Sequence, residues 1–424
     1  MRGGEAARSG GHPGLPRASP SVPDQDSEGR RRRLDRPVRR PGRKPGRAQA
    51  RGSTRSHPGR EGRMRALRLV RSILLNRMGG VPKPSWCTYL TTYRCNARCR
   101  MCDSWRIPKG AEMDVGEAER VFARLGPLDV VRLTGGEPFL RRDLPDLAAT
   151  ILRRSRPLSL HVTTNGSLTD EAVSFAERFP SPRRLAFMVS LDGLEETHDA
   201  NRGRQASFAR AFETLTRLAA LRAQRGFRLS VNHTVVSEAS MADAPALRAR
   251  CAALGIDVQT VVAYRSSAIY GMQEENGPAH DLILGNAYPL AFGLPRQRTL
   301  EFVRGEIRRC RDLRDPWLRV GKRFYLEGLS ERLRHCAQDR GPRCVALRSH
   351  VRLLPDGRVP VCQFNTQIVG SLREQELAEV WGDGPASRWR RWVDACPGCW
   401  AECEVIPNAL YSGAFLRLVR NGAK

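Results

Sequence analysis

The chain lacks any apolar run long enough to cross a bilayer as a helix, which takes about 18 residues or more, so we expect no transmembrane segment. Large apolar side chains are almost absent from residues 1–63, which are rich in Arg, Gly, Pro and Ser. Such a segment cannot bury enough surface to offset its ordering entropy, so we expect a disordered basic tail. It also lacks the apolar core of a secretory signal. An alternative is that translation begins at Met64.

Acidic residues are scarce relative to basic ones, since 44 Asp and Glu stand against 72 Lys and Arg and give a formal net charge of +28. Residues 1–63 hold 17 basic and 6 acidic side chains, a net +11. The remainder is moderately basic, which suits anionic or nucleotide-like ligands without demonstrating them. The run Arg30-Arg31-Arg32-Arg33 is compatible with binding to nucleic acid or to an anionic surface. A nucleic-acid partner is not favoured.

The chain does not have the form of a secreted disulfide scaffold, because its 12 cysteines are spread over 424 residues and several stand at metal-type spacings. This cysteine usage predicts a reducing, cytoplasmic compartment. Hydrophobic residues make up 40 % of the chain, which is enough for a sizeable core.

Three cysteines, Cys95, Cys99 and Cys102, stand at C-x3-C-x2-C spacing directly after a strand-like run, 86–93. Thiolates are the usual ligands of iron–sulfur clusters, and short spacings let several sulfurs converge on one cluster. Three ligands on four irons leave one iron open to an external ligand, as in an open catalytic metal site. The alternatives are a zinc knuckle or unrelated core cysteines. A zinc site would need a fourth Cys or His nearby, and the next dozen residues contain none.

Strand-like and helix-like segments alternate from Trp86 onward. The strand-like segments are 87–93, 129–134, 158–163, 184–191, 228–236 and 257–263, and the helix-like segments are 114–125, 141–154, 169–178, 207–224 and 243–254. This alternation predicts an α/β fold with a parallel sheet, and six units predict a partial (β/α)6 barrel over residues 85–300. In such barrels the chemistry lies at the C-terminal ends of the strands. Residues 265–300 are irregular, and we expect a loop or cap near the mouth of the barrel.

Two further segments flank the predicted barrel. Residues 64–84 predict a short basic amphipathic helix and a linker, because apolar residues recur at helical spacing among arginines over 64–78. Contact with a membrane surface is one option for this helix, and packing against the outside of the next domain is favoured. Residues 301–335 predict a helical bridge to a cysteine-rich region, 336–424.

Polar motifs follow three consecutive strands. They are Gly135-Gly136-Glu137-Pro138, Thr164-Asn165-Gly166 and Ser190-Leu191-Asp192-Gly193, and the segment 198–203 with Arg202 comes shortly afterwards. Each motif alone is ordinary turn chemistry. Polar side chains at consecutive strand ends are better explained by a shared polar ligand.

A second group of cysteines lies in the last ninety residues. Cys344 and Cys362 flank a predicted β-hairpin, 350–363, whose turn is Pro355-Asp356-Gly357. Cys396, Cys399 and Cys403 follow further along. In contrast, Cys87, Cys251 and Cys310 have no such partners, and we expect them to be core thiols.

Together these motifs resemble the radical S-adenosylmethionine (SAM) superfamily over roughly residues 85–405. The resemblance implies a [4Fe–4S] cluster on Cys95, Cys99 and Cys102 whose open iron binds SAM. It implies contacts to SAM from Gly135, Gly136, Glu137, Asn165, Ser190 and Asp192. Arg202 would pair either with the SAM carboxylate or with an acidic neighbour.

The C-terminal cysteines resemble the SPASM/twitch extensions of this superfamily, which hold one or two auxiliary [4Fe–4S] clusters. A full SPASM domain would need more cysteines after Cys399 than this chain has. The resemblance therefore implies a twitch-like single cluster on four thiols, with Cys336 and Cys403 as alternates; the four are Cys344, Cys362, Cys396 and Cys399. A structural zinc on the same four thiolates is the alternative.

The implied activity is reductive cleavage of SAM to a 5′-deoxyadenosyl radical that abstracts a hydrogen atom from the substrate, with electrons from a donor such as flavodoxin or ferredoxin. An auxiliary cluster would accept the electron when the substrate is oxidised. We expect an oxidoreductase or maturase acting on a peptide or protein side chain. The alternatives are a dehydrogenase of a small aminocyclitol or sugar and, more distantly, a non-catalytic iron–sulfur or nucleic-acid-binding protein.

Overall fold

The computed structural model describes residues 58–264, 288, 290–334, 341–382, 384–396 and 398–416, all within one compact unit. The predicted disordered tail, most of the predicted loop over 265–300 and Cys336 lie outside the described residues. Within the described part of the chain, no helix combines the length and the apolar character needed to cross a membrane.

An open sheet of seven parallel strands forms the centre of the fold, in the order β6-β5-β4-β3-β2-β1-β7. Six of its strands were predicted, and each bound lies within one residue of the prediction. These are β1 (Trp86–Thr92), β2 (Val130–Gly135), β3 (Ser159–Thr164), β4 (Leu185–Ser190), β5 (Arg228–Val235) and β6 (Asp257–Val262). The predicted α/β class and partial barrel are confirmed.

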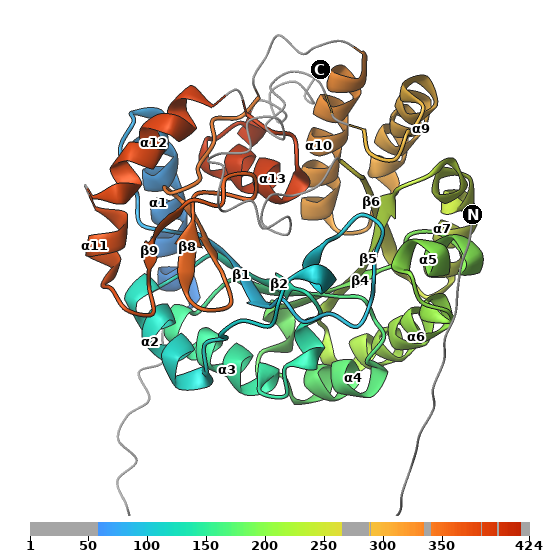
Figure 1. Ribbon diagram of the computed structural model, residues 1–424, viewed down its shortest axis with the longest axis horizontal. Coiled ribbons are helices and arrows are strands. Elements are labelled where there is room, and N and C mark those ends of the chain that lie inside the picture. Colours follow the sequence, from blue (N-terminus) through green and yellow to red (C-terminus); the bar gives the residue numbers. More distant parts are fainter. Residues whose placement is uncertain are drawn as a thin grey trace, which may run out of the picture. The chain divides into compact units, whose positions relative to one another are not determined.

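Helices follow the strands as predicted, and Figure 1 shows α2, α3, α4 and α6 in an arc along one side of the sheet. Their bounds are α2 (Val115–Leu125), α3 (Leu144–Ser155), α4 (Thr169–Arg178), α6 (Ser207–Arg225) and α7 (Glu238–Ala253). Capping boxes at Asp114 and Ser237 fix the starts of α2 and α7, so α7 begins five residues before its predicted start at 243. The short helix α5 (Glu195–Arg202) was not predicted.

The two faces of the sheet differ in polarity. Alternate residues such as Val131, Val162 and Val231 are fully buried in the core that the outer helices cover. The residues between them point to the opposite face, because successive side chains in a strand alternate. On that face stand half-buried polar side chains, among them Arg132, His161, Thr163, Ser230 and Asn232. The inner face of the half-barrel is therefore polar, unlike the all-apolar strands of a parallel sheet packed on both sides.

The C-terminal region begins with β7 (His350–Leu353), and here the prediction of a β-hairpin over 350–363 was wrong. The turn itself forms, since the Gly357 amide donates to the Leu354 carbonyl oxygen (3.0 Å) and Gly357 has φ +86°. However, β7 pairs in parallel with β1, whereas β8 (Arg358–Pro360) pairs antiparallel with β9 (Ile368–Ser371). The reason is burial, because Val351 and Leu353 complete the main core in this register.

Helices complete the fold on the inner side of the sheet, where Figure 1 shows α10 and α13. The predicted helical bridge forms two helices, α9 (Arg296–Arg309) and α10 (Pro316–Arg334). They are followed by α11 (Leu377–Trp381), α12 (Pro385–Ala395) and α13 (Glu402–Tyr411). The N-terminal helix α1 (Pro58–Arg77) packs against the body as favoured from sequence, since the Asn76 amide donates to Ser349 Oγ (2.8 Å) and to the Tyr411 carbonyl oxygen (3.0 Å).

Candidate functional site

The first three cysteines lie on the loop that follows β1, at the C-terminal end of that strand. The Cys102 amide donates to the Cys99 carbonyl oxygen (3.2 Å), which turns the loop back on itself. Burial raises the pKa of the Cys95 thiol to about 11 and that of Cys102 to about 12, and Cys99 adds to both shifts. A bound metal group would have to displace the protons of the Cys95 and Cys102 thiols, as thiolate ligation requires.

Helix α5 holds this loop through its backbone. The Arg98 amide donates to the Arg202 carbonyl oxygen (2.9 Å), and the Arg100 amide donates to that of Asn201 (2.8 Å). Gly203 follows at φ +60°, and a Cβ there would stand 2.7 Å from the Arg98 carbonyl oxygen. The unpredicted helix therefore shapes the loop that carries the cysteines.

The Gly-Gly pair after β2 packs directly against the cysteine loop. A Cβ on Gly135 would lie 2.2 Å from the Thr92 carbonyl oxygen, and one on Gly136 would lie 2.0 Å from that of Arg94. The Gly136 amide also donates to the Thr92 carbonyl oxygen (2.7 Å). The sequence motif alone pointed to close approach of a ligand. The structure adds a reason that needs no ligand, because only glycine lets the two loops meet.

Glu137 joins the end of β2 to the end of β3 and is fully buried. Its Oε1 accepts from Thr164 Oγ1 (2.8 Å) and its Oε2 accepts from the Asn165 amide (2.7 Å). Burial raises the pKa of this carboxyl to about 7, although these hydrogen bonds oppose the shift. Asn165 continues the connection, since its Nδ2 donates to Asn96 Oδ1 (2.8 Å) and lies 4.0 Å from Cys95 Sγ. The contact of Glu137 with the SAM amino group stays a prediction.

Asp192 and Arg202 form a buried ion pair beside the cysteine loop. Asp192 Oδ2 accepts from Arg202 Nη2 (2.7 Å) and from Asn201 Nδ2 (2.6 Å). Arg202 Nη1 lies 3.6 Å from Cys99 Sγ. The structure thus contains the acidic neighbour that the sequence offered for Arg202, and pairing of Arg202 with the SAM carboxylate stays a prediction. Ser190, at the end of β4, is buried close by in the chain.

Replacing Asp192 by Ala leaves the Arg202 guanidinium buried without its carboxylate. We expect the free energy of unfolding to fall by about 3–5 kcal/mol, measured by chemical denaturation. The matched control is Asp170→Ala, which removes the carboxylate from the exposed Arg217–Asp170 pair (2.7 Å). That change should cost less than about 1 kcal/mol. Equal losses in the two variants would contradict a structural role for the buried pair.

The four predicted auxiliary cysteines line one cavity of about 270 Å³; they are Cys344, Cys362, Cys396 and Cys399. They come from three places in the chain: Cys344 lies before β7, Cys362 lies after β8, and Cys396 and Cys399 lie between α12 and α13. The volume far exceeds the ~10–15 Å³ that a single water needs. Burial raises the pKa of the Cys344 thiol to about 12, and the Cys396 thiol adds to the shift. The donor set fits a four-coordinate group, either a [4Fe–4S] cluster or zinc.

The alternate ligand Cys403 is near these four cysteines but is not one of the residues that line the cavity. It packs with Cys396 and Cys399 around Phe364 and Ala401 but does not line the cavity. Across the described ranges, no three His, Cys, Asp or Glu side chains already stand as a ready site for a single metal ion. The thiols share a cavity rather than a preformed tetrahedral arrangement.

Three ionisable residues next to this cavity were not predicted. Glu404 is buried and lines the cavity with the thiols. Its Oε1 lies 2.5 Å from Arg352 Nη2 and its Oε2 lies 3.3 Å from His350 Nδ1. Burial would raise the pKa of Glu404, but Arg352 and His350 hold it well below its usual range. His350 Nε2 is in turn 3.0 Å from Thr88 Oγ1 on β1. A polar connection thus runs from the cysteine cavity to the central sheet.

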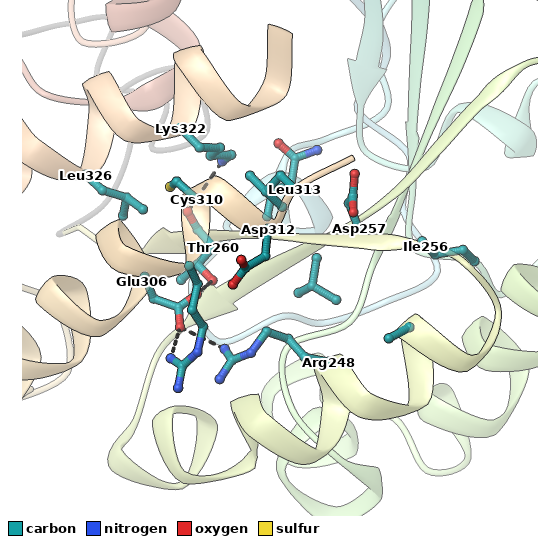
Figure 2. Close-up of a pocket in the computed structure, with 14 residues that line it drawn as sticks. Arg248, Ile256, Asp257, Thr260, Glu306, Cys310, Asp312, Leu313, Lys322 and Leu326 are labelled. Atoms are coloured by element: carbon teal, nitrogen blue, oxygen red, sulfur yellow. Dashed lines mark hydrogen bonds and ion pairs between the residues drawn. The ribbon is translucent and has the colours of Figure 1, made fainter. Parts of the chain in front are cut away.

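A second cavity of about 270 Å³ lies behind β6, between α7, α9 and α10 (Figure 2). Glu306 accepts hydrogen bonds there from Arg248 (2.8 Å) and from Thr260 Oγ1 (2.8 Å). Lys322, fully buried on α10, pairs with Glu402 (2.5 Å). Cys310, Cys251 and Cys87 are buried core residues, as predicted. The buried charges around this cavity pair with one another. We therefore interpret the cavity as part of the packing interface between the sheet and the helices α9 and α10.

Comparison with known proteins places these features in a family. The model of the radical SAM superfamily matches residues 89–251, and that of an iron–sulfur cluster-binding domain, SPASM, matches residues 344–403. The Fe-coproporphyrin III synthase of Methanosarcina barkeri is 31 % identical over 145 residues, 33 % of this chain and 35 % of that protein. The PqqA peptide cyclase of Granulibacter bethesdensis is 24 % identical over 321 residues, 74 % of this chain and 78 % of that protein.

Coverage of the curated relatives is partial in several cases. The chain spans 35 % of the coproporphyrin synthase and 46 % of the GTP 3′,8-cyclase of Aquifex aeolicus. Among solved structures, anSMEcpe with bound AdoMet has a TM-score of 0.52 at 16 % identity, covering 79 % of this chain and 95 % of that one. Streptococcus suis SuiB bound to precursor peptide SuiA has a TM-score of 0.50 at 16 % identity, covering 81 % and 74 %. These likenesses show the fold.

The motifs, the sheet and the two matched models agree on the cofactors as well, since a radical SAM domain implies SAM with a [4Fe–4S] cluster and a SPASM domain implies auxiliary iron–sulfur clusters. The chain belongs to the radical SAM superfamily and carries a SPASM iron–sulfur domain in its C-terminal region.

Proposed function

We propose that this chain oxidatively modifies a peptide or protein side chain. The observation that supports this best is the arrangement of two thiol sets around one sheet. The triplet Cys95, Cys99 and Cys102 lies at the C-terminal end of β1, and the four-thiol cavity connects through Glu404 and His350 to the same strand. Both thiol sets are therefore connected to β1, the triplet through the loop that follows the strand and the cavity through Thr88.

The residues around the cysteine triplet would hold and orient the SAM cluster. When bound, the reduced cluster and SAM supply a 5′-deoxyadenosyl radical, which abstracts a hydrogen atom from the substrate. Cys95, Cys99 and Cys102 would hold that cluster. Arg202 Nη1 lies 3.6 Å from Cys99 Sγ, so its guanidinium stands directly beside the predicted cluster ligands. The Gly135-Gly136 pair fixes the loop by backbone contact.

The auxiliary cavity supports oxidation as the outcome. Cys344, Cys362, Cys396 and Cys399 would hold one cluster able to accept the electron left on the substrate. A flavodoxin or ferredoxin would return electrons to the SAM cluster. A structural zinc in the cavity would remove the acceptor and indicate redox-neutral chemistry instead.

The proposed substrate is a peptide or protein side chain, with a small molecule as the second candidate. A peptide is favoured because the PqqA peptide cyclase matches over 74 % of this chain, and because SuiB, whose fold is alike, is known with a precursor peptide. A small aminocyclitol or sugar substrate is the second candidate. The single four-thiol cavity among the described residues favours it, since a full SPASM domain holds two clusters.

The test uses anaerobically reconstituted protein with SAM and a chemical reductant. We expect 5′-deoxyadenosine to form, and deuterium to enter it from a peptide that is encoded beside the gene and labelled at its C–H bonds. Deuterium transfer from a labelled aminocyclitol, but not from the peptide, would favour the second candidate. Absence of 5′-deoxyadenosine from protein that carries its full iron content would contradict both.

A further inference from the structure

Helix α1 has two apolar faces, and only one is covered. The inner face packs against the body through Leu69, which joins a cluster with Trp86, Val345 and Tyr411. Asn76 on the same face is fully buried and hydrogen-bonded to Ser349. These contacts fix the orientation of the helix and leave its opposite face turned outward.

The outer face carries a continuous apolar stripe. Met64 is 58 % exposed, Leu67 69 %, Val70 53 %, Leu74 53 %, and Met78, just past the helix, 80 %. They follow one another at intervals of three or four residues, so they share one side of the helix over four turns. Single exposed apolar residues are ordinary on protein surfaces, whereas a contiguous stripe marks an interaction site.

Charge decides what covers this stripe. Arg63 and Arg71 are exposed beside it, and the sequence up to residue 63 has a net charge of +11. A helix with exposed apolar side chains and flanking arginines suits the boundary between headgroups and acyl chains of an anionic bilayer. A second copy of this chain would bring arginines against arginines, which opposes pairing. Residues 1–63 have almost no large apolar side chains with which to cover the stripe.

We propose that the outer face of α1 binds the surface of an anionic phospholipid membrane. The apolar stripe supplies one signal and the basic residues supply the second, which together give a reversible peripheral attachment. Because the electrostatic part is screened by salt, the binding should weaken as ionic strength rises.

The test is co-sedimentation of the full-length protein with vesicles of phosphatidylglycerol and phosphatidylcholine, and with vesicles of phosphatidylcholine alone. We expect binding to the anionic vesicles that falls with added salt. The double variant Leu67→Glu, Leu74→Glu should reduce it at least tenfold. The matched control is Leu158→Glu, because Leu158 is a 51 % exposed leucine outside α1 and should have no effect. Equal thermal stability of all variants would show that each folds.

Three outcomes would overturn the proposal. The wild-type protein could fail to sediment with anionic vesicles. The double variant could bind as the wild type does, which would assign the binding to the basic residues alone. Wild-type protein could instead form a dimer that the double variant loses, which would make this face an interface between copies.

Discussion

Replacing Cys95, Cys99 and Cys102 together by Ala is expected to lower the iron content after anaerobic reconstitution from about eight to about four per chain. The variant should also lose all reductive cleavage of SAM. The physical reason is that the loop after β1 would retain its backbone contacts with α5 but no sulfur that can bind iron. Iron and acid-labile sulfide, measured together with 5′-deoxyadenosine, give the result.

Two matched variants separate this effect from general damage. Cys310→Ala removes a buried cysteine outside both thiol sets, so its iron content should equal that of the wild type. Cys344→Ala with Cys399→Ala removes two ligands from the C-terminal cavity and should leave about four irons with SAM cleavage intact. A triple variant that still held eight irons would show that the triplet is not a ligand set. A wild type with about four irons and one zinc would assign zinc to the cavity.

Replacing Gly136 by Ala is expected to disrupt the SAM site although no ligand atom is removed. Its new Cβ would stand 2.0 Å from the Arg94 carbonyl oxygen, next to Cys95, so the loop backbone must move. A displacement of about 1 Å at a reacting centre costs on the order of 100-fold in rate. We therefore expect at least that loss in SAM cleavage, together with a lower iron content at the triplet.

Gly110→Ala is the control for this substitution, because a Cβ at Gly110 meets nothing within 4 Å. That variant should match the wild type in iron content and rate. If Gly136→Ala also retained full iron and full cleavage, the two loops would not need their close contact. The role of the glycine pair would then rest on the ligand alone.

The strands of the half-barrel could be predicted from sequence because each is a short run rich in apolar or β-branched residues and bounded by turn residues, and local pattern is sufficient for that. The pairing of β7 with β1 could not be predicted in the same way. Trp86 and His350 meet across more than 260 residues of chain, and only the fold brings them together. The same limit explains why the Asp-Gly turn was found while the partners of its flanking strands were not.

The thiol sets were predicted because cysteine spacing is rare enough to carry information. The four C-terminal cysteines that were predicted as one set line one cavity in the structure. The contacts among the polar groups around them were found only in the structure. Nothing in the sequence near Glu404 signals His350 and Arg352, and the pairing of Asp192 with Arg202 depends on where α5 lies. Buried polar networks are tertiary features, so local periodicity does not reveal them.

The pairing of β7 with β1 also bears on the order in which the protein can be made. β1 leaves the ribosome early and carries the first cysteines directly behind it, but one of its two edges stays unpaired until residue 350 has been synthesised. An unpaired parallel edge invites association with other nascent chains. The two regions are therefore coupled during synthesis, since the central sheet is not complete until the C-terminal region has emerged.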